Sequence, residues 1–234
     1  MKSKILIVNA DDFGQSKGIN QGIIECYEKG IVTSASLMVR YDAVLEAVSY
    51  SKNNPGLGVG LHIDLGEWIY AGGNWDPLYE VVSLNDENAV QEEIIKQIES
   101  FTRIMGRKPT HIDSHQHVHQ QESIRPILVE IATNLNITLR GCSQKVKYCG
   151  DFYGQCLDGS PYHESISVSS LHNIISHLEE GITEMACHPA LFTDIETMYK
   201  IEREMEVNTL CDKSNKEAIR NSNVELCSFE GILF

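Results

Sequence analysis

The sequence predicts an α/β protein built around a parallel sheet, and three features of the chain indicate it. Short apolar segments rich in β-branched residues recur along the chain. Most stretches between them have the apolar spacing of amphipathic helices. The two kinds of segment alternate, and strands that alternate with helices pair in parallel with the helices as crossovers. The pattern leaves two architectures open, a closed barrel and a doubly wound open sheet.

The helices carry their own start and stop signals. In the first helix Ser16 is a candidate N-cap and Gly30 a stop. No internal repeat, low-complexity tract or linker divides the chain, so we expect a single domain over 1–234. The predicted strands are 5–9, 32–38, 57–63, 110–112, 137–140, 182–187 and 224–229. The other predicted helices lie in 87–105, 123–135 and 169–180.

The composition excludes several classes of function. A net charge of −14 argues against a nucleic-acid partner, because such binding depends on clustered Lys and Arg, and favours a small neutral substrate. No apolar run approaches the roughly 18 residues of a membrane-spanning helix. The apolar run after the N-terminal lysines is too short for a signal peptide. Without a long apolar run we expect a soluble protein that has no membrane partner. Seven cysteines without a C-x-x-C pattern are expected to be free thiols, which favours the reducing cytoplasm.

Polar side chains gather where the predicted strands end. Because active sites of parallel α/β folds form at the carboxyl ends of the strands, we expect these side chains to share one rim. They are Asp11 and Asp12 at the first strand, His62 and Asp64 at the third, Asp113, His115, His117 and His119 at the fourth, Arg140 at the fifth and His188 at the sixth.

The adjacent pair Asp11-Asp12 has a structural and a functional interpretation. Asp is common in turns and at helix N-caps, which accounts for either residue alone. At a metal site, one carboxylate binds the cation while its neighbour stays ionised as a base. In that interpretation Asp12 binds the metal and Asp11 takes the proton. The following Phe13-Gly14 does not indicate a kinase, since no glycine-rich loop or His-Arg-Asp loop accompanies it.

The strongest local signal is the segment 113–119, where three alternating imidazoles follow a carboxylate. Imidazoles suit borderline metals. One or two of them, with His62 and Asp12, would form a mixed nitrogen and oxygen site with an open position for water. A lone His62 is more often an ordinary buried histidine, but its place at a strand end favours function. Asp113 is a candidate to hold one imidazole in place.

Two further residues at strand ends have more than one interpretation. His188, held extended by Pro189, is a candidate metal ligand or general acid. Arg140 either binds a substrate oxygen or pairs with a carboxylate in a structural salt bridge. We expect three other histidines to be bystanders, namely His163, His172 and His177.

Two long irregular stretches carry aromatic residues. Segment 66–79 contains both tryptophans, Trp68 and Trp75, and segment 141–163 contains Tyr153. Aromatic side chains on the loops of an α/β enzyme suit stacking on a sugar ring or forming a lid. The alternative is that they cover otherwise exposed core.

Taken together, the motifs resemble the YdjC-like carbohydrate deacetylases, the family of chitooligosaccharide deacetylase. The similar segments follow the family order from residue 5 to about residue 190. They are Ile-Val-Asn-Ala-Asp-Asp-Phe-Gly at 7–14, Gly-Ile-Val-Thr-Ser at 30–34, Gly-Leu-His at 60–62, the segment 106–119 and Cys-His-Pro at 187–189. One departure is Gln116, where relatives often have histidine, and the segment 64–100 matches poorly.

The resemblance implies a deformed (β/α) barrel that removes acetyl groups from N-acetylated mono- or oligosaccharides. It implies a bound divalent cation, Mg²⁺ before Zn²⁺, and a homodimer is compatible with it. Carried onto this sequence, the metal ligands are Asp12, His62 and His115. Asp11 becomes the catalytic base, and His188 the general acid or a substrate contact. The candidate substrate-binding residues are Arg140, Tyr153 and Trp68.

Two alternatives remain open at this level. The first is another metal-dependent amide hydrolase, such as an amidohydrolase or a metallo-β-lactamase-like enzyme. The histidine runs of those enzymes are fuller or lie on a different strand, whereas here an Asp precedes the histidines. The second is a non-catalytic barrel that binds a sugar or a metal. Asp11 argues against it, because a binding protein has no use for a spare ionised carboxylate beside the metal.

Overall fold

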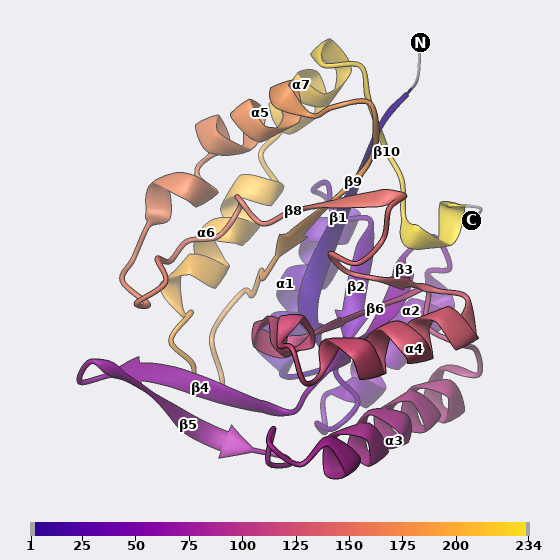
Figure 1. Ribbon diagram of the computed structural model, residues 1–234. Coiled ribbons are helices and arrows are strands. Elements are labelled where there is room, and N and C mark those ends of the chain that lie inside the picture. The colour runs from indigo at the N-terminus through magenta and orange to yellow at the C-terminus, as the bar shows by residue number, and fades with distance from the viewer. Residues whose placement is uncertain (1–2, 233–234) are drawn as a thin grey trace.

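The computed structural model describes residues 3–232, which fold around one sheet of parallel strands (Figure 1). Its strands follow the order β7-β6-β3-β2-β1-β9-β8, and β10 pairs with the start of β1. The sheet curves into a nearly closed barrel, which confirms the deformed (β/α) barrel that the resemblance implied. The strands are β1 (Lys4–Phe13), β2 (Ser34–Leu37), β3 (Gly58–Ile63), β6 (His111–Ser114), β7 (Thr138–Leu139), β8 (Val146–Cys149), β9 (Gly181–Cys187) and β10 (Val224–Leu226).

Each predicted strand segment overlaps an observed strand, but the two stretches expected to be irregular contain strands as well. In the first of them, β4 (Gly66–Ala71) and β5 (Asn74–Glu80) form an antiparallel hairpin. Its turn uses Gly72 and Gly73, both at positive φ, which glycine adopts without strain. Few β-branched residues occur in this hairpin, so the pattern that marked the other strands was absent. In the second stretch, β8 pairs with β9.

The helices connect the strands and lie on the outside of the sheet (Figure 1). In α1 (Lys17–Glu28) the side chain of Ser16 accepts a hydrogen bond from the Ile19 amide, as its predicted capping role requires. The other helices are α2 (Val44–Asn53), α3 (Glu87–Met105), α4 (Arg125–Leu135), α5 (Val168–His177), α6 (Ile201–Leu210) and α7 (Asn215–Asn221). Within the described part of the chain, the three short 3₁₀ helices are η1 (His115–Gln120), η2 (His163–Ile166) and η3 (Phe229–Gly231).

Strand β1 separates the apolar core from a polar interior. Leu6, Val8 and Ala10 belong to the main hydrophobic cluster, which includes residues of the surrounding helices. Because successive side chains of a strand point to opposite faces, Asn9 and Asp11 lie on the other face. There they contact each other and polar residues of neighbouring strands. The barrel therefore carries a buried polar network at the carboxyl ends of its strands.

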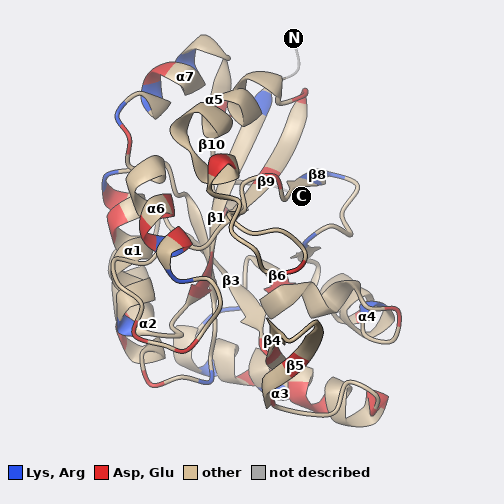
Figure 2. Cartoon of the chain, turned by 90° about the vertical axis from the view of Figure 1, so that its left-hand side faces the viewer, with Lys and Arg blue, Asp and Glu red and all other residues tan. Residues whose placement is uncertain are grey.

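Charged side chains of both signs are spread over the outer helices (Figure 2). In this view both α6 and α7 carry charges of both signs, and no single basic patch covers them. Within residues 3–232, no helix combines the length and the apolar character needed to span a bilayer. The seven cysteines are all free thiols, as the sequence predicted.

Candidate active site

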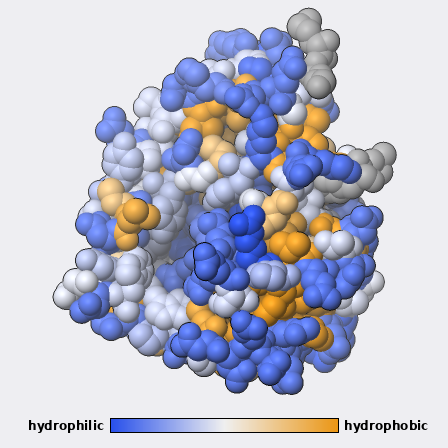
Figure 3. All heavy atoms as spheres, in the orientation of Figure 1, coloured by the Kyte–Doolittle hydropathy of each residue, from blue (hydrophilic) through white to orange (hydrophobic). Residues whose placement is uncertain are grey.

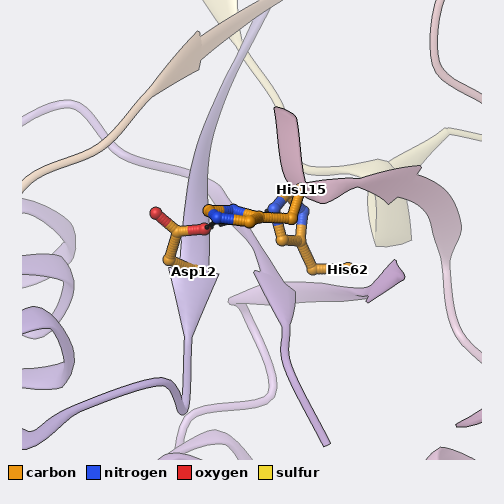
Figure 4. A group of neighbouring side chains, drawn as sticks. All are labelled: Asp12, His62 and His115. Carbon is orange, nitrogen blue, oxygen red and sulfur yellow. Dashed lines mark hydrogen bonds and ion pairs between the residues drawn. The ribbon is translucent and has the colours of Figure 1, made fainter. Parts of the chain in front are cut away.

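Three side chains from three parts of the barrel rim converge on one point (Figure 4). Asp12 lies near the end of β1, His62 in β3, and His115 at the start of η1. One oxygen, Asp12 Oδ1, lies 3.2 Å from His62 Nε2 and 3.1 Å from His115 Nδ1. Asp12 has a φ of 69°, in the left-handed region that residues with a side chain adopt rarely. Such strain is typical of functional sites, and here it accompanies the approach to both imidazoles.

The three side chains fit a divalent cation. One potential ligand atom from each lies within 4.8 Å of the others, and all three residues are buried. His62 Nε2 is fully buried without a hydrogen-bond partner among the described residues. An unpartnered buried nitrogen is unfavourable unless something binds it. One carboxylate and two imidazoles form a donor set that zinc and other borderline divalent cations accept.

Asp113 holds His62 in place, as the sequence indicated for one of the imidazoles. Its Oδ1 lies 2.7 Å from His62 Nδ1, and its Oδ2 accepts a hydrogen bond from Ser36 at 2.5 Å. A carboxylate on one ring nitrogen fixes the tautomer and leaves the other nitrogen for a metal. Although burial opposes the charged form, the Asp113 carboxylate raises the pKa of His62 to about 10. Asp12 likewise raises the pKa of His115 to about 9 against the effect of burial.

Arg140 is the centre of a buried ion cluster. It donates two hydrogen bonds to Asp11, at 2.6 and 2.7 Å, and one to Glu184 at 2.7 Å. A third carboxylate, Asp113, lies 2.6 Å from Arg140 Nη2. The residue follows β7 at the edge of the sheet and is 1% exposed. Its side chain extends into the interior, where it reaches Glu184 of β9. Of the two roles considered from the sequence, the structure supports pairing with carboxylates; a substrate contact does not fit a guanidinium enclosed in this way.

Asp11 remains ionised in this environment and faces His188. Burial favours its neutral form, but the Arg140 guanidinium outweighs this effect and lowers the pKa of Asp11. Its Oδ2 lies 3.7 Å from His188 Nε2 across the site. Glu206 accepts a hydrogen bond from the His188 amide, and Tyr153 packs edge-on against the His188 ring. The ionised carboxylate and the imidazole therefore lie close to each other on the wall of the site.

Sequence reasoning missed several charged residues of this site, among them Arg203 and Glu67. Arg203 on α6 donates a hydrogen bond of 2.7 Å from Nη2 to Asp12 Oδ2, so that Oδ1 alone faces the imidazoles. Glu67 on β4 is 3% exposed, and its Oε2 lies 3.4 Å from His115 Nε2. Neither residue lies in a motif or at the end of a predicted strand. The one indication in the sequence was that both residues are charged and lie in segments without a predicted helix or strand.

Other polar residues considered from the sequence have different surroundings. Asp64 lies away from the cluster, where it accepts hydrogen bonds from Arg40, Tyr41 and Tyr79. His119 is buried against the Ser114 hydroxyl. The ring of His117 contacts Tyr148. The predicted bystanders lie elsewhere: His163 contacts Glu202, His172 contacts Asn215, and His177 is bound to its own helix.

The cluster lines a cavity of about 910 Å³. Figure 3 shows the corresponding face of the molecule hollowed near its centre. Asp11, Asp12 and His188 line the cavity together with aromatic side chains from both long stretches, among them Trp68 and Tyr153. Trp75 on the hairpin also lines it and is 50% exposed. Arg140 is not among the lining residues, in keeping with its enclosed position.

The carboxylates and imidazoles at the rim of the parallel barrel can serve hydrolysis, and relatives at 35% and 34% identity are named deacetylases, which makes this chain a hydrolase. The chain belongs to the YdjC-like family, whose model, described as YdjC-like protein, matches residues 5–221. This confirms the resemblance seen in the motifs.

Similar proteins include enzymes of known name. The chitooligosaccharide deacetylase of Escherichia fergusonii is 35% identical over 97% of this chain and 98% of that protein. The enzyme of the same name from Salmonella paratyphi B is 34% identical with the same coverage. A crystal structure from Enterococcus faecalis V583, described as a candidate cellobiose-phosphate cleavage protein, superposes with a TM-score of 0.76 and 26% identity, covering 99% of this chain and all of the other.

The fold extends beyond close relatives. A family 4 carbohydrate esterase from Streptomyces lividans, solved with acetate, superposes with a TM-score of 0.55 over 97% of this chain and 93% of its own. Because only 12% of the residues are identical, this similarity concerns the barrel alone.

Proposed function

We propose that the protein is a metal-dependent carbohydrate deacetylase, which hydrolyses the acetamide of N-acetylated, chitooligosaccharide-like sugars to free amine and acetate. The observation that carries the proposal is the position of Asp11 and His188 beside the cluster of Asp12, His62 and His115, on the wall of one cavity. The names of the relatives at 35% and 34% identity support the choice of substrate class.

Asp12, His62 and His115 would hold the cation. When bound, a divalent cation supplies a Lewis acid for the acetamide carbonyl and for water. The carboxylate suits Mg²⁺ or Mn²⁺, and the two imidazoles suit Zn²⁺. We propose a divalent cation with Mg²⁺ favoured by the family and Zn²⁺ favoured by the donor set. Arg203 contributes by occupying the second oxygen of Asp12, which restricts that carboxylate to one oxygen toward the site.

The proton transfers are assigned to Asp11 and His188. Asp11 is the base that accepts the proton of the attacking water, and the Arg140 guanidinium keeps it ionised for this task. His188 donates a proton to the departing amine, a poor leaving group without one. Tyr153 and Trp68 line the cavity and are proposed to contact the sugar.

The test is acetate release from N-acetylglucosamine, N,N'-diacetylchitobiose and longer chitooligosaccharides. Metal-stripped protein is assayed alone and after addition of magnesium, zinc, manganese or cobalt. We expect acetate only when a metal is added, and the panel then identifies the cation and the preferred chain length. Metal binding without acetate from any sugar would contradict the proposal and favour another acyl substrate or a binding protein.

A further inference from the structure

The β4–β5 hairpin brings a buried carboxylate to one imidazole of the metal-ligand cluster. Glu67 Oε2 lies 3.4 Å from His115 Nε2, and this nitrogen has no hydrogen-bond partner among the described residues. The other nitrogen, Nδ1, lies 3.1 Å from Asp12 Oδ1. The two ring nitrogens of His115 therefore face two carboxylates, one on β1 and one on the hairpin.

His62 also lies between two carboxylates, with its ring nitrogens exchanged and with a hydrogen bond to Asp113 where His115 has the longer contact to Glu67. Its Nδ1 lies 2.7 Å from Asp113, and its Nε2 lies 3.2 Å from Asp12 Oδ1. A carboxylate that accepts the N–H of one ring nitrogen keeps the proton there and leaves the opposite nitrogen free to bind a metal. Asp113 thus presents Nε2 of His62 to the site. Glu67 is placed to present Nδ1 of His115 in the same way.

A side-chain clamp keeps the hairpin beside the ligand segment. Gln116, the neighbour of His115, accepts a hydrogen bond from the Trp68 amide and donates one to the Trp68 carbonyl, both at 2.8 Å. Gln116 has a φ of 47° and His117 one of 54°, values that residues with a side chain adopt rarely. The clamp joins this unusual turn to the residue that follows Glu67. The position of Glu67 is therefore linked to the backbone that carries His115.

We propose that Glu67 is a positioning residue, which keeps the proton of His115 on Nε2 and so makes Nδ1 the metal-binding nitrogen. This inference rests on the proposed function, because it takes Asp12, His62 and His115 as the ligands. It extends that function to the hairpin, which lies in the segment 64–100 that matches the family motifs poorly. The hairpin then has two tasks, since it also supplies Trp68 and Trp75 to the cavity wall.

Zinc affinity provides the first test. Dissociation constants are measured by competition with a coloured chelator for the wild type, Glu67→Ala, Glu67→Gln and Asp76→Asn. Removal of a residue that orients a ligand typically weakens metal binding about 10- to 100-fold, and we expect this of Glu67→Ala. Glu67→Gln retains an acceptor oxygen and should lose less. Asp76, an exposed carboxylate on the partner strand of the same hairpin, is the matched control and should leave the affinity unchanged.

The second test reads the tautomer directly and needs no substitution. In the zinc-loaded protein labelled with ¹⁵N-histidine, long-range ¹H–¹⁵N spectra report which ring nitrogen carries the proton. We expect His115 to be protonated on Nε2 and His62 on Nδ1. Coordination of His115 through Nε2 would overturn the inference even if every Glu67 variant failed to fold.

The outcomes separate the inference from the proposed function. Wild-type affinity together with an unchanged His115 spectrum in Glu67→Ala would overturn the role of Glu67 and leave the metal site intact. A wild-type protein that binds no zinc and releases acetate without any metal would overturn both.

Discussion

The two walls of the cavity differ in burial and in the kind of side chain that they present. The inner wall consists of Asp11, Asp12 and His62, which lie on barrel strands and are at most 2% exposed. The outer wall includes Trp75 on the hairpin, 50% exposed, and Tyr153, 39% exposed. Every charge of the inner wall has a paired partner, whereas the outer wall presents partly exposed aromatic rings to the cavity. Groups that react need fixed positions, which strands and ion pairs supply, while groups that select a substrate need shape and apolar area. The comparison therefore predicts that the inner wall controls turnover and stability and that the outer wall controls substrate preference.

The largest effect is expected for Asp11→Asn. An amide cannot accept the proton of the attacking water, and removal of a general base typically costs about 10² to 10⁴ in rate. The metal ligands are untouched, so zinc affinity should stay within a few-fold of the wild type. Turnover is measured by acetate release and affinity by chelator competition. Loss of the metal in a folded variant would show that the roles of Asp11 and Asp12 are exchanged.

Arg140→Met tests whether the inner wall is also a structural unit. Its removal leaves Asp11, Asp113 and Glu184 buried without their cation, and breaking such a buried pair typically costs about 3–5 kcal/mol. Urea unfolding of the metal-free protein measures the free energy. The control is Arg103→Met, an exposed arginine on α3, for which we expect a change of about 0.5 kcal/mol or less. Equal stability of the two variants would show that the inner wall is not a structural unit.

Proton release on metal binding tests the charge state of His62 on the inner wall and of the neighbouring His115. Since the pKa of His62 is about 10 and that of His115 about 9, both imidazoles carry an extra proton at pH 7.5 before the metal binds. Coordination requires the neutral form, so zinc should release about two protons. Calorimetry in two buffers of different ionisation enthalpy measures this number. If both histidines were already neutral at this pH, zinc would release almost no protons. That result would contradict the pairing of His62 with Asp113 and of His115 with Asp12.

The same shifts give the sign of the pH dependence without metal. Both folded-state pKa values lie above 6.5, the ordinary pKa of a histidine side chain, so the folded state binds these protons more tightly than the unfolded state. Their contribution to stability is fully present below pH 6.5. It is lost as the pH rises through about 9 and then 10. Unfolding of metal-free protein by urea at pH 6.5, 8 and 10 measures this loss.

The smallest effect is expected for Trp75→Ala on the outer wall. A stacking contact of an aromatic ring contributes about 1 kcal/mol, which corresponds to about a fivefold decrease in kcat/KM. We expect this decrease for sugars long enough to reach the hairpin and no change in zinc affinity or unfolding. Leu45→Ala, an exposed residue on α2 outside the cavity, is the control. A large loss of metal from Trp75→Ala would show that the two walls are not separable.

The sequence alone determined seven of the eight strands described in the main sheet, all but β8, and the polar residues at their ends. Local patterns carry this information, because a buried strand needs an apolar run and a helix needs its cap and its spacing. Ser16 as a cap and Asp113 as the partner of an imidazole could both be assigned in this way. Sequence spacing did not indicate the hairpin strands, since glycine, asparagine and proline gave them the composition of a loop.

Only the tertiary structure decided which charges meet. Arg203 reaches Asp12 across 191 residues of sequence, and Arg140 reaches Asp11 across 129. Glu67 meets His115 because the clamp of Gln116 holds the hairpin there. Pairing between distant charges depends on where whole elements pack, and no local period or cap records it. Motifs could therefore name the candidate ligands, but the residues that fix and neutralise them became visible only once the barrel was formed.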